Sequence, residues 1–174
     1  MEDFRIKVNL GGMIEILSDH LYSSPNVYIR ELLQNGVDAI NARKNKGIDT
    51  DGCITLDIEE GSRLVFTDNG LGLTEAEIHQ FLAIIGESSK RNLTNGRIHT
   101  DYIGRFGIGL LSCFMVSDEI RMYTKSCSAP DAPVLEWRGK PDGTYNIINH
   151  GTNCEDAAFF NDSPGTQVVL SAKP

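Results

Sequence analysis

The order of two hydrophobic periods along the chain constrains the fold more than any other feature. Residues 25–47 carry apolar side chains at helical spacing, with Ser24 and Pro25 at one end and Gly47 at the other, as is typical of helix boundaries. From residue 53 the period changes to two, in a hairpin pattern over 53–68. Further strand patterns follow near 119–125, 134–139, 145–149 and 166–170. Helices early and strands late predict an α+β fold, a two-layer α/β sandwich with a mixed, mostly antiparallel sheet and helices on one face.

The helix over 25–46 is expected to bury one apolar stripe and to carry a polar trio beside it. The residues predicted to be buried are Val27, Leu32, Leu33, Val37 and Ile40. Glu31, Asn35 and Asp38 are spaced i, i+4 and i+7, so they leave one face and could point at one ligand. A solvated helix face is the alternative. Asn35 disfavours this alternative, because asparagine has a poor propensity for the inside of a helix and its presence there suggests another role.

The segment "DNGLGL", residues 68–73, ends a predicted strand with an acid. A tight turn is the simple interpretation, since Asp, Asn and Gly are the usual turn residues. However, Gly70 and Gly72 remove side chains beside Asp68, which would let a flat ligand approach the backbone while a buried carboxylate accepts its hydrogen bond. Such a bond contributes on the order of 1.5–3 kcal/mol, enough to select an amino-bearing ring.

Two further segments complete the set of motifs. A helix predicted after residue 73 has Thr74 and Glu77 in the positions of a capping box. "GRFGIG", residues 104–109, precedes a short predicted helix and could present backbone N–H groups to an anion, although a flexible hinge explains it equally well. It is neither a Walker loop nor a dinucleotide fingerprint in its usual setting. Thr166, at the start of a late strand, carries little meaning alone.

Composition excludes several classes of function. The formal net charge of −8 argues against binding nucleic acid and against docking on an anionic membrane. No segment reaches the roughly 18 apolar residues of a spanning helix. The four cysteines and four histidines are scattered without a CxxC pair, so neither a zinc site nor a disulfide scaffold is expected. Reduced cysteines and the absence of a secretory signal pattern predict a cytoplasmic protein.

Taken together and in this order, the motifs resemble the GHKL (Bergerat-type) ATP-binding fold of gyrase B, MutL, histidine kinases and heat-shock chaperones. The segments "LYSSPNVYIRELLQNGVDAI", "TDNGLGLTEAEIHQFLAIIGESSK" and "IGRFGIGLLSCFMVSDEI" are similar to signature segments of the heat shock protein 90 (HtpG-like) chaperone family. The resemblance extends from about Phe4 to Leu170 and is weakest between Ser128 and Asp162.

The resemblance implies a site for ATP or ADP with Mg²⁺. Asn35 would be the metal ligand, and Glu31, one turn earlier, would activate the water that attacks the γ-phosphate. Asp68 would accept the adenine amino hydrogen, with Thr166 bonding the same region through water. The other implied nucleotide contacts are Gly72 and Leu73 at the ring, Gly107, Ile108, Gly109 and Leu110 at the phosphates, and Asp38 at the pocket wall.

The resemblance also implies a domain organisation. Residues 1–174 would form an N-terminal ATP-binding domain, with a mobile lid over about 86–103 and with middle and dimerisation domains after residue 174. Where the chaperones usually carry a lysine after "TIA", this chain has Glu87, and Lys90 or Arg91 is the candidate replacement for that charge. In the family a middle-domain arginine helps to stabilise the γ-phosphate, so slow turnover, if any, is expected for the domain alone. Isolated domains of this type are mostly monomeric, and a homodimer is expected for the full-length protein.

The implied function is that of a stress-response chaperone that binds unfolded client proteins and assists folding through nucleotide-driven lid closure and dimer clamping. Two alternatives stay open. One is another GHKL ATPase; Glu31 disfavours a histidine-kinase catalytic domain, and the acidic balance disfavours a gyrase B- or MutL-like DNA enzyme. The other is a nucleotide-sensing module without useful hydrolysis.

Overall fold

The computed structural model describes residues 26–48, 51–59, 62–80, 109–152, 154–161 and 163–173. Within these ranges six strands form one sheet in the order β1-β2-β6-β3-β4-β5, and every pairing is antiparallel. The strands are β1 Ile54–Glu59, β2 Arg63–Asp68, β3 Ile120–Lys125, β4 Val134–Gly139, β5 Tyr145–Asn149 and β6 Gly165–Ser171. The helical elements are α2 Val27–Asn45, residues 75–80, residues 109–111 continuing into the 3₁₀ helix η2 Ser112–Met115, and the 3₁₀ helix η3 Glu155–Asn161.

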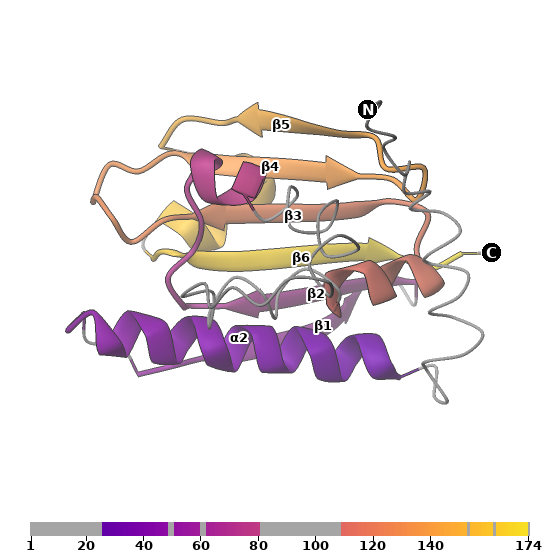
Figure 1. Ribbon diagram of the computed structural model, residues 1–174, viewed down its shortest axis with the longest axis horizontal. Helices are drawn as coiled ribbons and strands as arrows, with labels where there is room; N and C mark the ends of the chain where they lie inside the picture. Colours follow the sequence, from indigo (N-terminus) through magenta and orange to yellow (C-terminus); the bar gives the residue numbers. More distant parts are fainter. Residues whose placement is uncertain are drawn as a thin grey trace, which may run out of the picture.

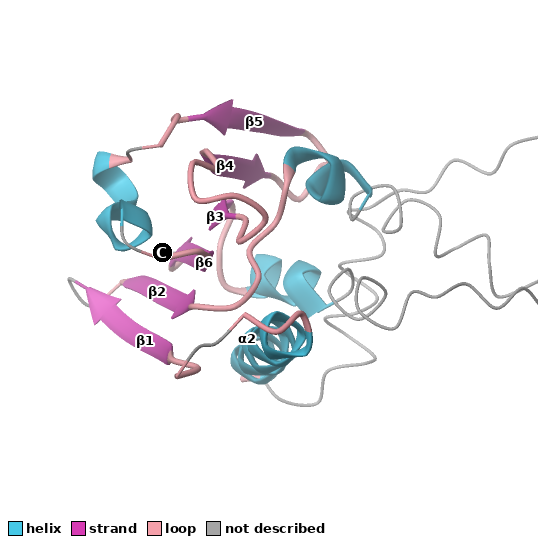
Figure 2. Ribbon diagram, turned by 90° about the vertical axis from the view of Figure 1, so that its left-hand side faces the viewer, coloured by secondary structure: helices cyan, strands magenta, loops and turns pink. Residues whose placement is uncertain are grey.

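The sheet separates the helices into two groups. α2, residues 75–80 and residues 109–115 lie on one face, and η3 lies on the other (Figures 1 and 2). The predicted α+β sandwich is confirmed, with η3 as an addition on the second face. None of the helices in the described ranges combines the length and the apolar character needed to cross a membrane.

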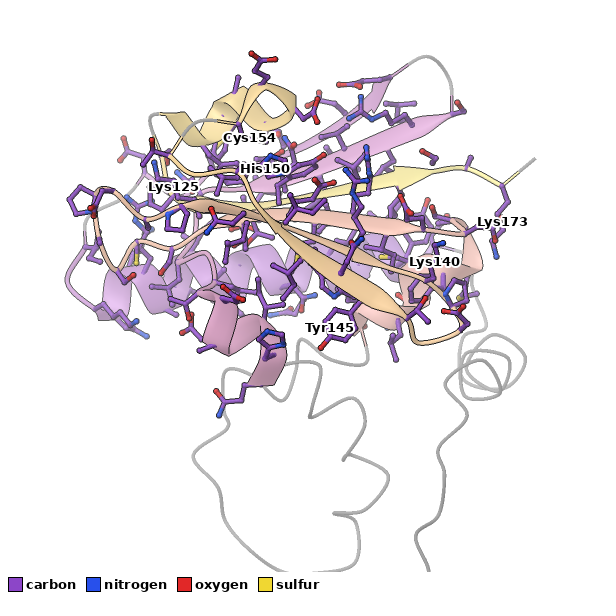
Figure 3. All side chains as sticks on the ribbon, turned by 90° about the horizontal axis from the view of Figure 1, so that it is seen from above. Lys125, Lys140, Tyr145, His150, Cys154 and Lys173 are labelled. Carbon is purple, nitrogen blue, oxygen red and sulfur yellow. The ribbon has the colours of Figure 1, made fainter. Side chains whose placement is uncertain are left out.

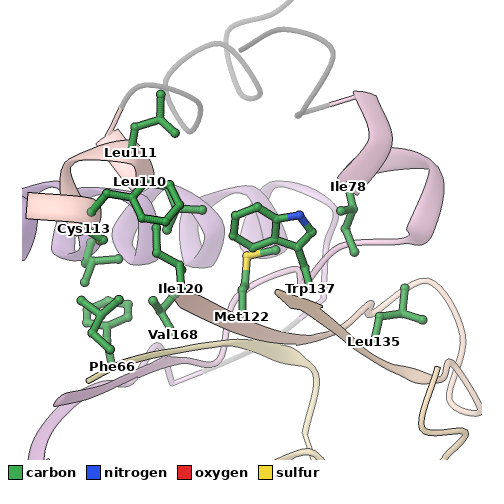
Figure 4. Packing of buried hydrophobic residues seen from close by; sticks show 13 residues of the cluster. Phe66, Ile78, Leu110, Leu111, Cys113, Ile120, Met122, Leu135, Trp137 and Val168 are labelled. Atoms are coloured by element: carbon green, nitrogen blue, oxygen red, sulfur yellow. The ribbon is translucent and has the colours of Figure 1, made fainter. Parts of the chain in front are cut away.

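The main core fills the space between the sheet and the first group of helices (Figure 4). It consists of Leu32, Phe66, Ile78, Leu110, Leu111, Cys113, Phe114, Ile120, Met122, Leu135, Trp137, Val168 and Leu170. Each large apolar side chain buried in this way contributes about 1.5–3 kcal/mol relative to exposure. A second cluster, which includes Tyr123 and Phe160, packs on the face that carries η3. The two clusters therefore cover both faces of the sheet.

The face that α2 turns to the sheet differs in part from the predicted stripe. Its buried residues are Val27, Leu32, Asn35, Gly36, Ala39 and Ile40. Leu33 and Val37 are 41% and 44% exposed, so the prediction that they are buried is wrong. Small residues take their place because α2 lies very close to the sheet. A Cβ at Gly36 would lie only 3.0 Å from Ile54 Cδ1 and 3.1 Å from Phe66 Cζ.

The two ends of α2 agree unequally with the sequence. The helix begins at Val27, with Asn26 as N-cap and no capping hydrogen bond from its side chain, whereas Ser24 was the predicted cap. Ser24 and Pro25 lie outside the described residues. The predicted end is confirmed, since Gly47 follows the helix with a φ of +73°. Its N–H donates to Lys44 O at 2.9 Å, and the next N–H donates to Arg43 O at 3.3 Å, which is a Schellman motif.

Local signals in the middle of the chain are confirmed more fully. β1 and β2 form the predicted hairpin, with Glu59 opposite Arg63. The capping box is present, because Thr74 N donates to Glu77 Oε2 at 2.8 Å and Glu77 N donates to Thr74 Oγ1 at 3.3 Å. The sequence also alternates over 4–8 and has helical spacing over 13–22; both patterns, like the predicted lid over 86–103, lie outside the described residues.

Candidate functional site

Asp68 is the most unusual ionisable group in the described part of the chain. It ends β2 on the face that carries the main core and is only 2% exposed. The N–H of Gly70 donates to its Oδ1 at 2.8 Å. Burial raises the pKa of Asp68 from 3.8 to about 7, although hydrogen bonds from the backbone of Gly70 and Thr166 act in the opposite direction. A further donor from a ligand would favour the ionised form of this carboxyl group.

Two threonines lie beside Asp68 on the neighbouring strands. β6 places Thr166 opposite Asp68, and β3 places Thr124 opposite Thr166. Thr124 is fully buried; its hydroxyl accepts from the N–H of Leu73 at 2.8 Å and donates to Gly165 O at 3.1 Å. Thr124 belongs to none of the sequence motifs described above. Its signal was a polar residue at an inward position, in step with the apolar side chains of β3.

Gly72, four residues after Asp68, is required by the local backbone conformation and by a close backbone contact. Gly72 has a φ of +62°, and a Cβ at this position would overlap the carbonyl oxygen of Lys125. The adjacent Leu71 O accepts from the N–H of Cys127 at 2.8 Å, and Leu71 N donates to Ala39 O at 3.2 Å. The segment 69–73 is therefore fixed between α2 and the end of β3, and it leaves the Asp68 carboxyl group in a defined position.

α2 contributes a buried side-chain amide on the face that it turns to the sheet. Asn35 is 5% exposed, and its buried Nδ2 has no hydrogen-bond partner in the described structure. Its neighbour Gly36 lies against Asp68, since a Cβ at Gly36 would be 3.3 Å from the Cβ of Asp68. A buried polar group without a partner is costly, commonly by about 1–3 kcal/mol. A bound ligand could supply the missing partner.

Glu31 and the glycine-rich segment meet one turn earlier on α2. A Cβ at Gly109 would lie 2.7 Å from Glu31 Oε2, so the start of the helical residues 109–111 lies directly against this carboxylate. Arg30 Nη2 lies 3.6 Å from Glu31 Oε1. The structure thus brings together an acid of α2 and the backbone of the predicted anion-binding segment.

The remaining predicted site residues either make contacts that do not point to a ligand or lie outside the described residues. Asp38 accepts a hydrogen bond from Gln34 Nε2 at 2.9 Å within an exposed pair on α2, so its described contact is local to the helix. The Leu110 side chain is buried in the main core, which leaves only its backbone for a ligand. Gly107 and Ile108 lie outside the described residues.

Comparisons with known proteins give this arrangement a context. The family described as "Histidine kinase-, DNA gyrase B-, and HSP90-like ATPase" matches residues 22–150. The chain therefore belongs to this family of ATPases.

Similar proteins place it more narrowly. "Chaperone protein HtpG" of Mycobacterium avium (strain 104) is 27% identical over 193 residues, covering 100% of this chain and 28% of the relative. "TNF receptor-associated protein 1 homolog, mitochondrial" of Dictyostelium discoideum is 31% identical over 176 residues, covering 93% and 23%. The HtpG chaperone of Salinispora arenicola (strain CNS-205) is 28% identical over 190 residues, covering 99% and 28%. The predicted resemblance to HtpG-like chaperones is confirmed, and the chain spans about a quarter of the length of these relatives.

Proposed function

We propose that this chain is the ATP-binding domain of an HtpG-like chaperone and that ATP binds between α2 and the end of the sheet at Asp68. The observation that supports this most is the buried Asp68 carboxyl group, paired across the sheet with Thr166 and covered by Gly36 of α2. The amino group of adenine would donate to Asp68, and Thr166 would bond the same region through water. Gly72 and Leu73 would line the ring.

The phosphates would extend from there along α2 toward Glu31. The backbone of Gly107, Ile108, Gly109 and Leu110 would donate to them. Gly109 already lies against Glu31, which supports a triphosphate that ends beside this carboxylate. Glu31 would orient and deprotonate the attacking water, and Asp38 would support the pocket wall.

Mg²⁺ fits the donor set on this face of α2. Within the described ranges, no three His, Cys, Asp or Glu side chains are grouped so that they could hold a metal ion alone. Mg²⁺ at a nucleotide commonly takes most of its oxygen ligands from water and phosphate, so one amide oxygen from the protein suffices. Asn35 can provide it through Oδ1, and its buried Nδ2, which has no partner in the described structure, could donate to a phosphate oxygen. When bound, the ion would neutralise charge on the phosphates.

Several finer properties belong to the same proposal. Turnover by the isolated domain is slow, and the domain alone is a monomer. A protein of the relatives' length forms a homodimer, and it binds unfolded client proteins through lid closure over residues 86–103 and dimer clamping. The proposed compartment is the cytoplasm, with a role in the stress response. All four cysteines are free, as expected in a reducing compartment.

Calorimetric titration with ATP and ADP, with and without Mg²⁺, tests the proposal. The chain should bind both nucleotides, and Asp68→Ala should abolish binding because the adenine loses its acceptor. Asp57→Ala is the matched control, since Asp57 is an exposed acid on β1 and should leave the affinity unchanged. Unchanged affinity in Asp68→Ala, with the fold intact by circular dichroism, would reject the adenine site.

A further inference from the structure

A cavity outside the proposed nucleotide site lies at the end of the sheet where β3 ends and β6 begins. Its volume is about 320 Å³. Three parts of the chain line it: the end of α2, the segment after β3 and the segment before β6. The lining residues are Arg43, Ile48, Lys125, Cys127, Ala129, Pro130, Ser163 and Pro164. The cavity therefore combines apolar walls with cationic side chains, in a volume that suits a small molecule.

Both charged residues of this lining are cations, although the chain as a whole carries a net charge of −8. Lys125 is only 8% exposed, and its Nζ donates to the main-chain oxygen of Phe160 at 3.0 Å. Neither Lys125 nor Arg43 forms a salt bridge with an acid in the described ranges. A buried ammonium group has three donors and is costly without a counter-charge. An anion in the cavity would supply that charge.

Arg43 adds a second source of positive charge. Its Nη1 donates to Asn69 O at 2.8 Å, and its Nε has no hydrogen-bond partner among the described residues. The guanidinium group is thus only partly satisfied by the protein. Guanidinium groups bind carboxylates and phosphates well because their donors form a planar fork.

The cavity shares a wall with the segment that positions Asp68. Arg43 bonds to Asn69, Cys127 bonds to Leu71, and the carbonyl group of Lys125 packs against Gly72. Three residues that line the cavity therefore contact the segment 69–72, at positions 69, 71 and 72. A ligand that moves Arg43 or Lys125 would displace the backbone on which the proposed adenine contact depends.

We propose that this cavity binds a small organic oxyanion, a carboxylate or a phosphate monoester with an apolar part, and that its occupancy changes the nucleotide affinity at Asp68. The coupling rests on the proposed function, whereas the binding of the oxyanion does not. Coupling between two sites is reciprocal, so nucleotide would change the affinity for the oxyanion by the same factor.

Protection of Cys127 from alkylation tests the binding step without nucleotide. In a Cys53→Ser background, Cys127 is the accessible thiol, because Cys113 and Cys154 are buried. The probes are phenyl phosphate, benzoate and inorganic phosphate, with uncharged benzyl alcohol as control and neutral iodoacetamide as reagent. At ten times its dissociation constant, a bound oxyanion should slow labelling about tenfold. Comparing protection by phenyl phosphate with protection by benzoate shows whether the site prefers a phosphate or a carboxylate. Inorganic phosphate should protect less than phenyl phosphate, because it has no apolar part to contact the apolar walls.

Variants assign the protection to the two cations. Arg43→Gln and Lys125→Met should each weaken protection, whereas Lys140→Met should retain it, since Lys140 lies at the opposite end of the molecule from Lys125 (Figure 3). Arg43→Gln keeps the test decisive if Lys125→Met does not fold. The proposal is overturned if no oxyanion protects Cys127, if benzyl alcohol protects equally, or if Arg43→Gln retains full protection. Equal protection by inorganic phosphate would overturn the role of the apolar walls.

Titration with ATP in the presence and absence of saturating phenyl phosphate or benzoate tests the coupling. The ATP dissociation constant should change by about fivefold or more, and Arg43→Gln should remove that change. An unchanged constant would overturn the coupling. If ATP does not bind at all, the proposed function fails, while the protection of Cys127 still decides whether the oxyanion site exists.

Discussion

Asp68 is both the proposed adenine contact and a buried acid that is costly to ionise. Its pKa is about 7 in the folded chain, against an ordinary value of 3.8, because burial penalises the carboxylate. Between pH 3.8 and about 7, the Asp68 carboxyl group is therefore protonated in the folded chain and ionised in the unfolded chain. Its contribution to stability is fully present below pH 3.8 and is lost as the pH rises through about 7.

Asp68→Asn should gain stability relative to the wild type as the pH rises, since asparagine does not ionise. The expected gain is on the order of 1.4 kcal/mol per pH unit across this window. Urea unfolding of both proteins without nucleotide, near pH 5 and near pH 8, measures it. A difference that stays constant between the two pH values would show that Asp68 ionises normally in the fold.

Asn35→Ala should remove the Mg²⁺ dependence of ATP binding, because the amide oxygen is the proposed protein ligand. Its buried Nδ2 has no partner in the described structure, so the truncation should cost the fold little. Asn41→Ala, an exposed residue of the same helix, is the control and should keep the Mg²⁺ dependence. ATP titrations with Mg²⁺ and with EDTA decide the matter; retained dependence in Asn35→Ala would place the metal elsewhere.

Asp68, Asn35 and Thr166 could be singled out from the sequence because each belongs to a motif with a physical reason or a family resemblance. Thr124 could not, since a threonine in a strand is ordinary and its hydrogen bonds with Leu73 and Gly165 depend on the assembled sheet. The sequence likewise could not predict that Arg43 and Lys125 lie at the same cavity. They approach one cavity only after α2 and β3 have packed.

Elements differ in how much of their structure is local. The capping box at Thr74 and the Schellman end at Gly47 were predictable, because their hydrogen bonds close within a few residues. The buried face of α2 was not, since it depends on the distance to the sheet. At that close distance Gly36 fits where larger side chains would collide, and Leu33 and Val37 turn outward.

Gly72→Ala tests how tightly the segment after β2 is fixed. The substitution meets two penalties, a positive φ and an overlap with the carbonyl oxygen of Lys125. Gly151→Ala is a matched control, because Gly151 has a φ of +69° but no heavy atom within 4 Å of an added Cβ. Gly151→Ala should cost about 1 kcal/mol, and Gly72→Ala clearly more. Equal losses in urea unfolding would contradict the close packing.

For the whole molecule, the proposed role of Glu31 predicts that ATP binding and ATP turnover can be separated. In a protein of the relatives' length, Glu31→Ala should keep ATP affinity within about tenfold and eliminate hydrolysis, because the proposed function assigns this carboxylate only to the attacking water. Glu155→Ala is the control, since Glu155 is an exposed acid of η3 on the other face of the sheet. Wild-type phosphate release by Glu31→Ala would assign the base to another group.

The overall class was predictable from the order of helical and strand patterns, but the strand order was not. Alternating residues show which face of a strand is apolar, and they do not show which strand is its neighbour. Here β6, the last strand in the sequence, lies between β2 and β3, which precede it by many residues.

This strand order has a consequence for synthesis on the ribosome. A chain that has emerged only through β5 contains Asp68 and Thr124 but lacks β6, the strand that lies between them. The edges of β2 and β3 that pair with β6 are then unpaired along their full length. If Asp68 binds adenine as proposed, this capacity appears late in synthesis, when Gly165–Ser171 leaves the exit tunnel and pairs with both strands.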